Sequence, residues 1–207
     1  MEMEKEEVYL LILNLEQIMI QIYDDIFDKI FLLEMSLWLM EKCDWRCTNV
    51  ANRNTVPYGI DGSHRFMGSE IYENPELDEN KYLDYLNKSD YKQQLEQFWG
   101  MYGDIQKFSK NKCMLQSIWG NLQYKDMNGT WHYDGNENQT VFIMMFAYHD
   151  IEENMGGEFC HEPSGQNIPF KQGRIMEMTA SDKHKGLAFN VPYIPRFTVK
   201  FTGLNKG

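Results

Sequence analysis

Apolar and polar residues follow two different rhythms along the chain. In the first half, apolar positions recur at helical spacing in residues 28–42 and again in residues 76–110, which predicts two amphipathic helices packed on a core. The short run of residues 18–25 is apolar and partly alternating, so a first strand is expected there. Residues 1–18 are compatible with a helix that has a polar start or with a loosely fixed extension.

From about Cys113 onward, the pattern predicts strands instead of helices. Short apolar segments are separated by Gly, Asn, Asp and Pro, the residues that favour turns. The predicted strands are residues 113–124, 129–134, 139–150, 156–162, 172–180, 186–191 and 196–204. Helices followed by a run of strands are typical of a mainly β fold, a sandwich or barrel flanked by N-terminal helices, and not of alternating βαβ units.

Residues 45–70 are rich in Asn, Gly, Ser and Thr, a composition typical of loops. Loops of this length usually have a binding or covering role, so we predict a lid here. The chain has 207 residues, which is the size of one domain. We therefore expect a single domain, residues 1–207, in which residues 1–112 supply support and the lid, and residues 113–204 form the core.

Composition narrows the classes of function. The formal net charge of −11 argues against a broad basic surface for duplex nucleic acid or for an anionic membrane. Four cysteines are too few for a disulfide-built secreted domain, so we expect reduced thiols and a cytoplasmic location. The acidic N-terminus MEMEKEE is unlike a signal peptide, and polar residues interrupt the apolar stretch from Val8 to Ile22, so no membrane span is expected.

The main candidate chemistry is a possible metal site. His132 and Asp134 are two residues apart in a predicted strand, and such residues share one face. Two histidines and one carboxylate are the ligand set of non-haem Fe(II) oxygenases, which leaves positions open for substrate and oxygen. The His-x-Asp pair alone is a weak signal in a chain with five histidines. His184, farther along the chain and just before another predicted strand, is the candidate for the third ligand.

A candidate anion site follows the third histidine. Arg196 lies in the last predicted strand, and a guanidinium can hold a carboxylate with two parallel hydrogen bonds. Thr198 is two residues further along, so its hydroxyl shares the strand face of Arg196. This pair is suited to the far carboxylate of a dianionic co-substrate.

Taken in order, these motifs resemble a known superfamily. The segments WHYDG, GGEF, QGRIMEM, HKG and RFT follow one another in the chain. In this order the region of about residues 113–204 resembles the Fe(II)- and 2-oxoglutarate-dependent dioxygenases, and GGEF after AYHDIEEN resembles most the prolyl 4-hydroxylase-like branch. The resemblance implies a double-stranded β-helix, or jelly roll, with N-terminal helices supporting one sheet.

The resemblance also implies roles for individual residues. His132, Asp134 and His184 would hold Fe(II), and Arg196 with Thr198 would bind 2-oxoglutarate. The implied reaction uses O2, releases succinate and CO2, and hydroxylates an unactivated C–H bond, with ascorbate as a candidate reductant. The chemically difficult step belongs to the metal, while the protein supplies positioning and a dry pocket.

Two further residues enter through the resemblance. Tyr124 stands where related hydroxylases have a tyrosine that hydrogen-bonds 2-oxoglutarate, although an ordinary core role is the alternative. Lys200 is the rival anchor for 2-oxoglutarate, because hydroxylases of the collagen type use lysine for this purpose. The presence of Asp134 argues against related halogenases, in which a small residue replaces this carboxylate.

The substrate stays open at this point. A protein or peptide side chain is the first expectation, and a small molecule is the alternative within the same superfamily. A catalytically silent jelly roll that binds a ligand and a cupin-type metal enzyme without 2-oxoglutarate are the other two hypotheses. The cupin-type hypothesis leaves Arg196 and Thr198 without a role.

Overall fold

The computed structural model describes residues 20–46 and 67–206, apart from scattered positions between 75 and 91. The predictions for residues 1–18, for Cys47 and for most of the lid therefore lie outside the described residues. The other three cysteines are free thiols, as expected. In the described part of the chain, no helix is long and apolar enough to cross a membrane.

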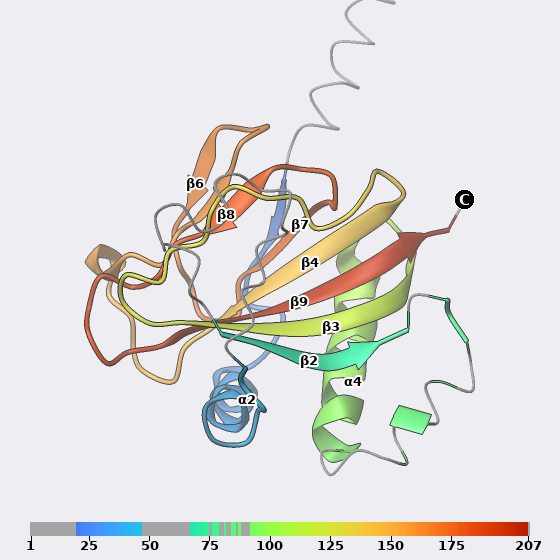
Figure 1. Cartoon of the computed structure of the whole chain (residues 1–207), viewed down its shortest axis with the longest axis horizontal. Coiled ribbons are helices and arrows are strands. Elements are labelled where there is room, and N and C mark those ends of the chain that lie inside the picture. Colours follow the sequence, from blue (N-terminus) through green and yellow to red (C-terminus); the bar gives the residue numbers. More distant parts are fainter. Residues whose placement is uncertain are drawn as a thin grey trace, which may run out of the picture.

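A six-stranded antiparallel sheet forms the middle of the molecule (Figure 1). In spatial order its strands are β1 (Gln21–Tyr23), β7 (Ile175–Thr179), β4 (Gln139–Phe146), β9 (Arg196–Asn205), β3 (Cys113–Gln123) and β2 (Met67–Glu73). The two strands from the first half of the chain, β1 and β2, lie at the two edges. The first half therefore completes the sheet as well as covering it.

Two helices, α2 (Lys29–Glu41) and α4 (Lys92–Phe108), pack against one face of this sheet. Asp28 caps α2 at its start, because its carboxylate accepts a hydrogen bond from the backbone N–H of Phe31 at 2.9 Å. In Figure 1, α4 crosses behind β3, β4 and β9. The apolar faces of both helices and the sheet residues they cover form the larger of two core clusters.

A smaller sheet packs on the other face. It contains β6 (Gln166–Ile168), β5 (Phe159–His161) and β8 (His184–Gly186), and a 3-10 turn, η1 (Glu153–Met155), precedes it. Phe159 and Ile168 of this sheet contact Ile143 and Met176 of the large sheet in the second core cluster. The result is a layered fold in which the helices, the large sheet and the small sheet follow one another.

The prediction of a mainly β protein flanked by helices is confirmed. The helix expected over residues 28–42 and the strands expected over 113–124 and 196–204 match α2, β3 and β9 closely. The described helix α4 forms the second part of the helix predicted over residues 76–110.

Three local predictions are wrong. The end of the expected lid is the edge strand β2, because Met67–Glu73 finds backbone partners along β3 despite its loop-like composition. Residues 129–134 form an extended loop with a single bridge to β8, not a strand. The strand expected over residues 186–191 instead covers His184–Gly186, and β6 was not predicted.

Candidate metal centre

His132, Asp134 and His184 meet because the loop that carries the first two is pinned to the small sheet. The backbone N–H of His132 donates to the carbonyl of His184 at 3.0 Å, and the reverse bond is 3.1 Å long. The backbone N–H of Asp134 donates to the carbonyl of Ala180, just past the end of β7, at 3.0 Å. These bonds fix the relative position of the three side chains without a continuous strand.

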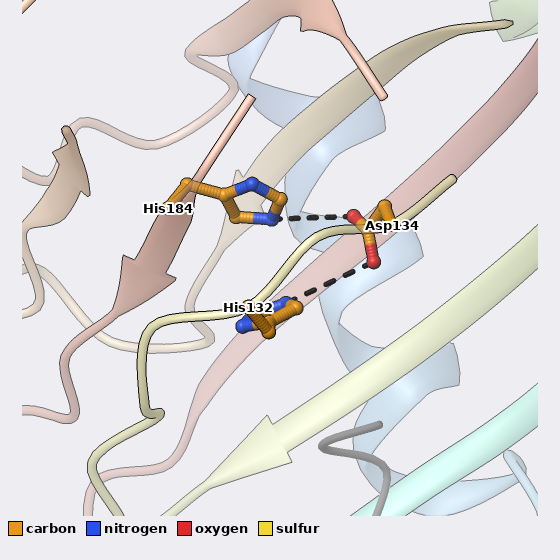
Figure 2. A group of neighbouring side chains, drawn as sticks. All are labelled: His132, Asp134 and His184. Atoms are coloured by element: carbon orange, nitrogen blue, oxygen red, sulfur yellow. Dashed lines mark ion pairs between the residues drawn. The ribbon is translucent and has the colours of Figure 1, made fainter. Parts of the chain in front are cut away.

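The three side chains point towards one another (Figure 2). Among the described residues they are the one group of His, Cys, Asp or Glu side chains with metal-ligand proximity, and their ligand atoms lie within 4.8 Å of one another. Asp134 Oδ2 is 3.2 Å from His184 Nε2, and Asp134 Oδ1 is 3.8 Å from His132 Nε2. Each side chain therefore offers one atom to a common point.

The hydrogen bonds of the two imidazoles show which nitrogens are free to bind a metal. His132 Nδ1 lies 2.7 Å from the carbonyl oxygen of Thr130, and His184 Nδ1 lies 2.8 Å from that of Asp182. A carbonyl only accepts, so both Nδ1 atoms carry the proton and both Nε2 atoms keep their lone pair. This arrangement of a carbonyl, a histidine and a metal position is common in metalloproteins.

The chemistry of these three side chains itself indicates a site for a cation. Two Nε2 lone pairs and a carboxylate face one another, which is unfavourable unless a positive charge lies between them. His184 Nε2 and Asp134 Oδ2 have no hydrogen-bond partner in the described structure, although both are buried. A divalent metal ion with affinity for imidazole and carboxylate would satisfy all three groups.

The surroundings keep the ligands in the protonation states that a metal needs. Burial lowers the pKa of His132, and the nearby His184 lowers it further. Burial alone would raise the pKa of Asp134, but the charge of Lys200 and the proximity of His184 outweigh it and hold this pKa well below its usual range. A neutral imidazole and an ionised carboxylate are therefore favoured.

Lys200 forms the closest ion pair of the site. Its Nζ lies 2.6 Å from Asp134 Oδ1, and both side chains are largely buried. Oδ1 is thus held by the lysine, while Oδ2 is turned towards His184. Oδ2 is therefore the carboxylate oxygen that would be available to a metal ion.

Arg196 lies beside the centre, buried on the first residue of β9, with 1% of its surface exposed. Its Nε donates to the carbonyl of Gly157 at 2.9 Å, and its Nη1 donates to Gln123 Oε1 at 2.8 Å. Nη2 is buried with no hydrogen-bond partner in the described structure. Burial lowers the pKa of the guanidinium to about 10, so it stays charged at neutral pH.

A cavity of about 40 Å³ joins this arginine to the metal ligands. Arg196, Thr198 and the three candidate ligands all line it, as does Lys200. The expectation that Arg196 and Thr198 share one strand face is met. The predicted site residues are therefore brought together, with one exception.

The exception is Tyr124, which is 39% exposed and is not among the residues that line the cavity. Alternation along β3 gives the physical reason. Leu122 packs into the helix-side core, whereas Asn121 and Gln123 line the cavity. Gln123 is the functional candidate that sequence reasoning missed, and it lies directly opposite Arg196 in the register of β3 and β9.

His161 does not belong to the metal group. It is buried opposite His184 in the small sheet, and its two ring nitrogens lie 2.8 Å from Ser164 Oγ and 3.3 Å from Asp182 Oδ2. Both of its nitrogens are thus occupied, in line with a structural role.

A second, larger cavity of about 270 Å³ opens from the same centre. It shares His132, Asp134, Lys200 and Asn121 with the small cavity. The metal position is thus accessible from two directions, one towards Arg196 and one along the sheet towards β2.

Comparison with known proteins shows which solved structures have a similar fold. No protein-family model and no curated protein matches the sequence. Among solved structures, a 2OG-Fe(II) oxygenase family oxidoreductase from Burkholderia pseudomallei is similar, with a TM-score of 0.55 and 13% identity over 93% of this chain and 91% of that one.

Two further similar structures illustrate the range of substrates. A prolyl hydroxylase of Trichoplax adhaerens, in complex with a hypoxia inducible factor peptide fragment, has a TM-score of 0.54 and 12% identity, covering 90% of this chain and 83% of that one. HygX of Streptomyces hygroscopicus, with nickel, 2-oxoglutarate and hygromycin B bound, has a TM-score of 0.52 and 10% identity, covering 96% and 86%. The resemblance predicted from the motifs is thus confirmed at the level of the fold.

Proposed function

We propose that this chain is an Fe(II)- and 2-oxoglutarate-dependent oxygenase of one jelly-roll domain that hydroxylates an unactivated C–H bond. The observation that carries the proposal is the convergence of two histidine Nε2 lone pairs and the Asp134 carboxylate beside a buried arginine. The shared fold supports it. A catalytically silent binding protein would have no need of this arrangement.

Arg196 is the proposed anchor for the far carboxylate of 2-oxoglutarate. Its Nη2 is buried and unpartnered in the described structure, whereas the Lys200 ammonium is already paired with Asp134. This difference favours Arg196 over Lys200, and Thr198 adds a hydroxyl from the same strand face. An isolated buried charge is costly, so an anionic ligand is the natural partner.

Room for the co-substrate requires a small rearrangement. The cavity at Arg196 measures about 40 Å³, enough for about one water molecule and too little for a five-carbon dicarboxylate. The Gln123 side chain occupies the position in front of Nη1. We expect Gln123 to shift when 2-oxoglutarate binds, so that both guanidinium nitrogens can meet the carboxylate.

The chain's own residues have three tasks in this reaction. When bound, Fe(II) would supply the activation of O2. One oxygen atom would go to succinate as 2-oxoglutarate loses CO2, and the other would convert the substrate C–H bond to a hydroxyl group. His132, Asp134 and His184 would hold the metal, and Lys200 pairs with Asp134 Oδ1 and keeps this carboxylate ionised. Arg196 and Thr198 orient the co-substrate, and the surrounding apolar side chains of the second core cluster exclude water from one side.

The test of this function is metal- and co-substrate-dependent succinate release. The purified protein, loaded anaerobically with Fe(II) and 2-oxoglutarate, is exposed to oxygen in the presence of peptide and metabolite pools. We expect succinate to form only when all three components are present, and the His184→Ala variant to form none. Iron-independent succinate formation, or none with any pool in a protein shown to bind both ligands, would contradict the proposal.

A further inference from the structure

Most of the side chains that line the larger cavity are polar. Beyond the candidate ligands and Lys200, its described lining includes the polar side chains of Glu73, Gln116, Ser117, Asn121, Gln139 and Thr202. Trp119 supplies one flat aromatic surface, and the described lining contains no aliphatic side chain. Gln139 already donates to Gln116 Oε1 at 2.7 Å. A ligand that hydrogen-bonds to the polar lining would be favoured over an apolar one, which would displace water from these groups without replacing its hydrogen bonds.

The register of β3 and β9 places these groups in a continuous row, which is called the track below. On the cavity face of β3 and β9 the opposed pairs are Gln123 with Arg196, Asn121 with Thr198, Trp119 with Lys200, and Ser117 with Thr202. At about 3.4 Å per residue, the six-residue separation between the first and last pairs corresponds to roughly 20 Å. The track runs along β3 and β9 from the anion-binding end, past the metal centre, to the level of Glu73, the last residue of β2.

The two ends of this track carry opposite charge. Arg196 lies at one end, Lys200 lies between the two ends, and Glu73 lies opposite Ser117 at the other end, where the pairing of β2 with β3 stops. The Glu73 carboxylate is partly buried. Within the larger cavity, Lys200 is paired with Asp134, and Glu73 is the carboxylate of the described lining that lies away from the candidate metal ligands.

We propose that this cavity binds a small, hydroxyl-rich substrate whose amino group pairs with Glu73, and not a prolyl side chain. This inference rests on the proposed oxygenase function and names the substrate class of the same site. The volume of about 270 Å³ suits a single saturated ring with its substituents, a little below the usual range for drug-sized ligands. The ring would lie on Trp119, with its hydroxyls on the neighbouring amides and hydroxyls.

Binding to the metal-loaded protein with 2-oxoglutarate under anaerobic conditions tests the inference. The probes are glucosamine, glucose as its uncharged counterpart, and N-acetylprolinamide, each followed by saturation-transfer NMR and titration. We expect glucosamine to bind at least about fivefold more tightly than glucose, and N-acetylprolinamide to bind more weakly than either.

Variants identify the residue responsible. Glu73→Gln should bring the affinity for glucosamine down to that for glucose, whereas Glu73→Asp should keep part of the preference. Glu137→Gln removes an exposed carboxylate outside the cavity lining, so it should leave the preference unchanged. A preference for N-acetylprolinamide, or a glucosamine preference that survives Glu73→Gln, would overturn the inference.

The same samples separate this inference from the function on which it rests. Binding of iron and 2-oxoglutarate depends on the ligands and Arg196, all of them outside the Glu73 end of the track. If both bind but glucosamine shows no advantage, the substrate class is wrong and the oxygenase proposal stands. If neither binds, the oxygenase proposal itself falls.

Discussion

The two faces of the large sheet differ in chemistry although the same strands build both. On β9, Phe197, Val199 and Phe201 face the helices and are fully buried. The residues that alternate with them, Arg196, Thr198 and Lys200, line the cavity beside the metal centre. Strict alternation along one strand thus separates the side chains that stabilise the fold from those proposed to carry its chemistry.

The difference shows how the polar face is tolerated in the interior. The buried charges there differ in their partners: Lys200 pairs with the carboxylate of Asp134, whereas Arg196 donates to the neutral acceptors of Gln123 and Gly157. Such pairs rarely add net stability compared with apolar side chains of similar volume. Their presence is better explained by ligand binding. Substitutions on the helix-facing side should therefore lower stability, and substitutions on the cavity side should alter the binding of metal or co-substrate.

The largest effect is expected on the helix-facing side. Phe201→Ala removes a fully buried ring that lies 5.9 Å from the ring of Tyr102, measured between centroids. We expect the free energy of unfolding to fall by about 3–5 kcal/mol, as is typical of phenylalanine deletions in cores. The neighbouring change Thr202→Val, on the cavity face, should cost under about 1.5 kcal/mol. Denaturant unfolding of both variants measures this contrast, and equal losses would contradict it.

The next effect is on metal binding. His184→Ala removes one of three ligands, and we expect Fe(II) affinity to fall by more than about 100-fold, beyond the usual effect of changing an outer partner of a ligand. His161→Ala is the matched control, since this histidine is equally buried and lies opposite His184 in the small sheet. Anaerobic titration, corrected for the folded fraction, should show near-normal affinity in the control. The reverse result would make His161 the ligand.

A smaller effect is expected at the proposed anchor. Arg196→Met should weaken 2-oxoglutarate binding by about 10- to 100-fold, the range expected for the loss of hydrogen bonds to a charged group, and leave Fe(II) affinity nearly unchanged. Arg196→Lys keeps the charge without the two-pronged contact, so an intermediate loss is expected. Lys200→Met is the comparison that decides between the two candidate anchors. If it weakens 2-oxoglutarate binding more than Arg196→Met does, Lys200 is the anchor.

The smallest effect separates Gln123, the last residue of β3, from Tyr124, which follows it. Gln123→Ala removes the acceptor that must shift away from Arg196 Nη1 when 2-oxoglutarate binds, so we expect 2-oxoglutarate affinity to rise about two- to tenfold. Tyr124→Phe should change nothing, since this side chain lies outside the lining of the cavity. Calorimetric titration of the iron-loaded variants provides the measurement. A loss confined to Tyr124→Phe would restore the role predicted from the resemblance.

Sequence periodicity predicts this fold well where a segment packs on one defined face. The apolar spacing of residues 28–42 and the alternation of residues 196–204 both predicted their elements within a residue or two. β2 could not be predicted in the same way, because Gly68 and Ser69 are residue types that favour turns and Glu70 is charged. Their strand conformation comes from pairing with β3, a contact between distant parts of the chain.

The candidate site was predictable to a similar extent. Residue type and order indicated His132, Asp134 and His184, and strand alternation placed Thr198 on the face of Arg196. The pairing of Lys200 with Asp134 could not be foreseen, because it depends on how β9 passes beside a loop 66 residues earlier in the chain.

The central claim, that the polar face of the sheet holds an iron and 2-oxoglutarate centre, is tested most directly by one anaerobic titration. Fe(II) and then 2-oxoglutarate are added to the wild-type chain and to His184→Ala, and bound ligand is measured by calorimetry. We predict one equivalent of iron in the wild type, 2-oxoglutarate binding that strengthens once iron is present, and loss of both effects in the variant. Iron binding that is absent, or that is identical in the two proteins, would contradict the account.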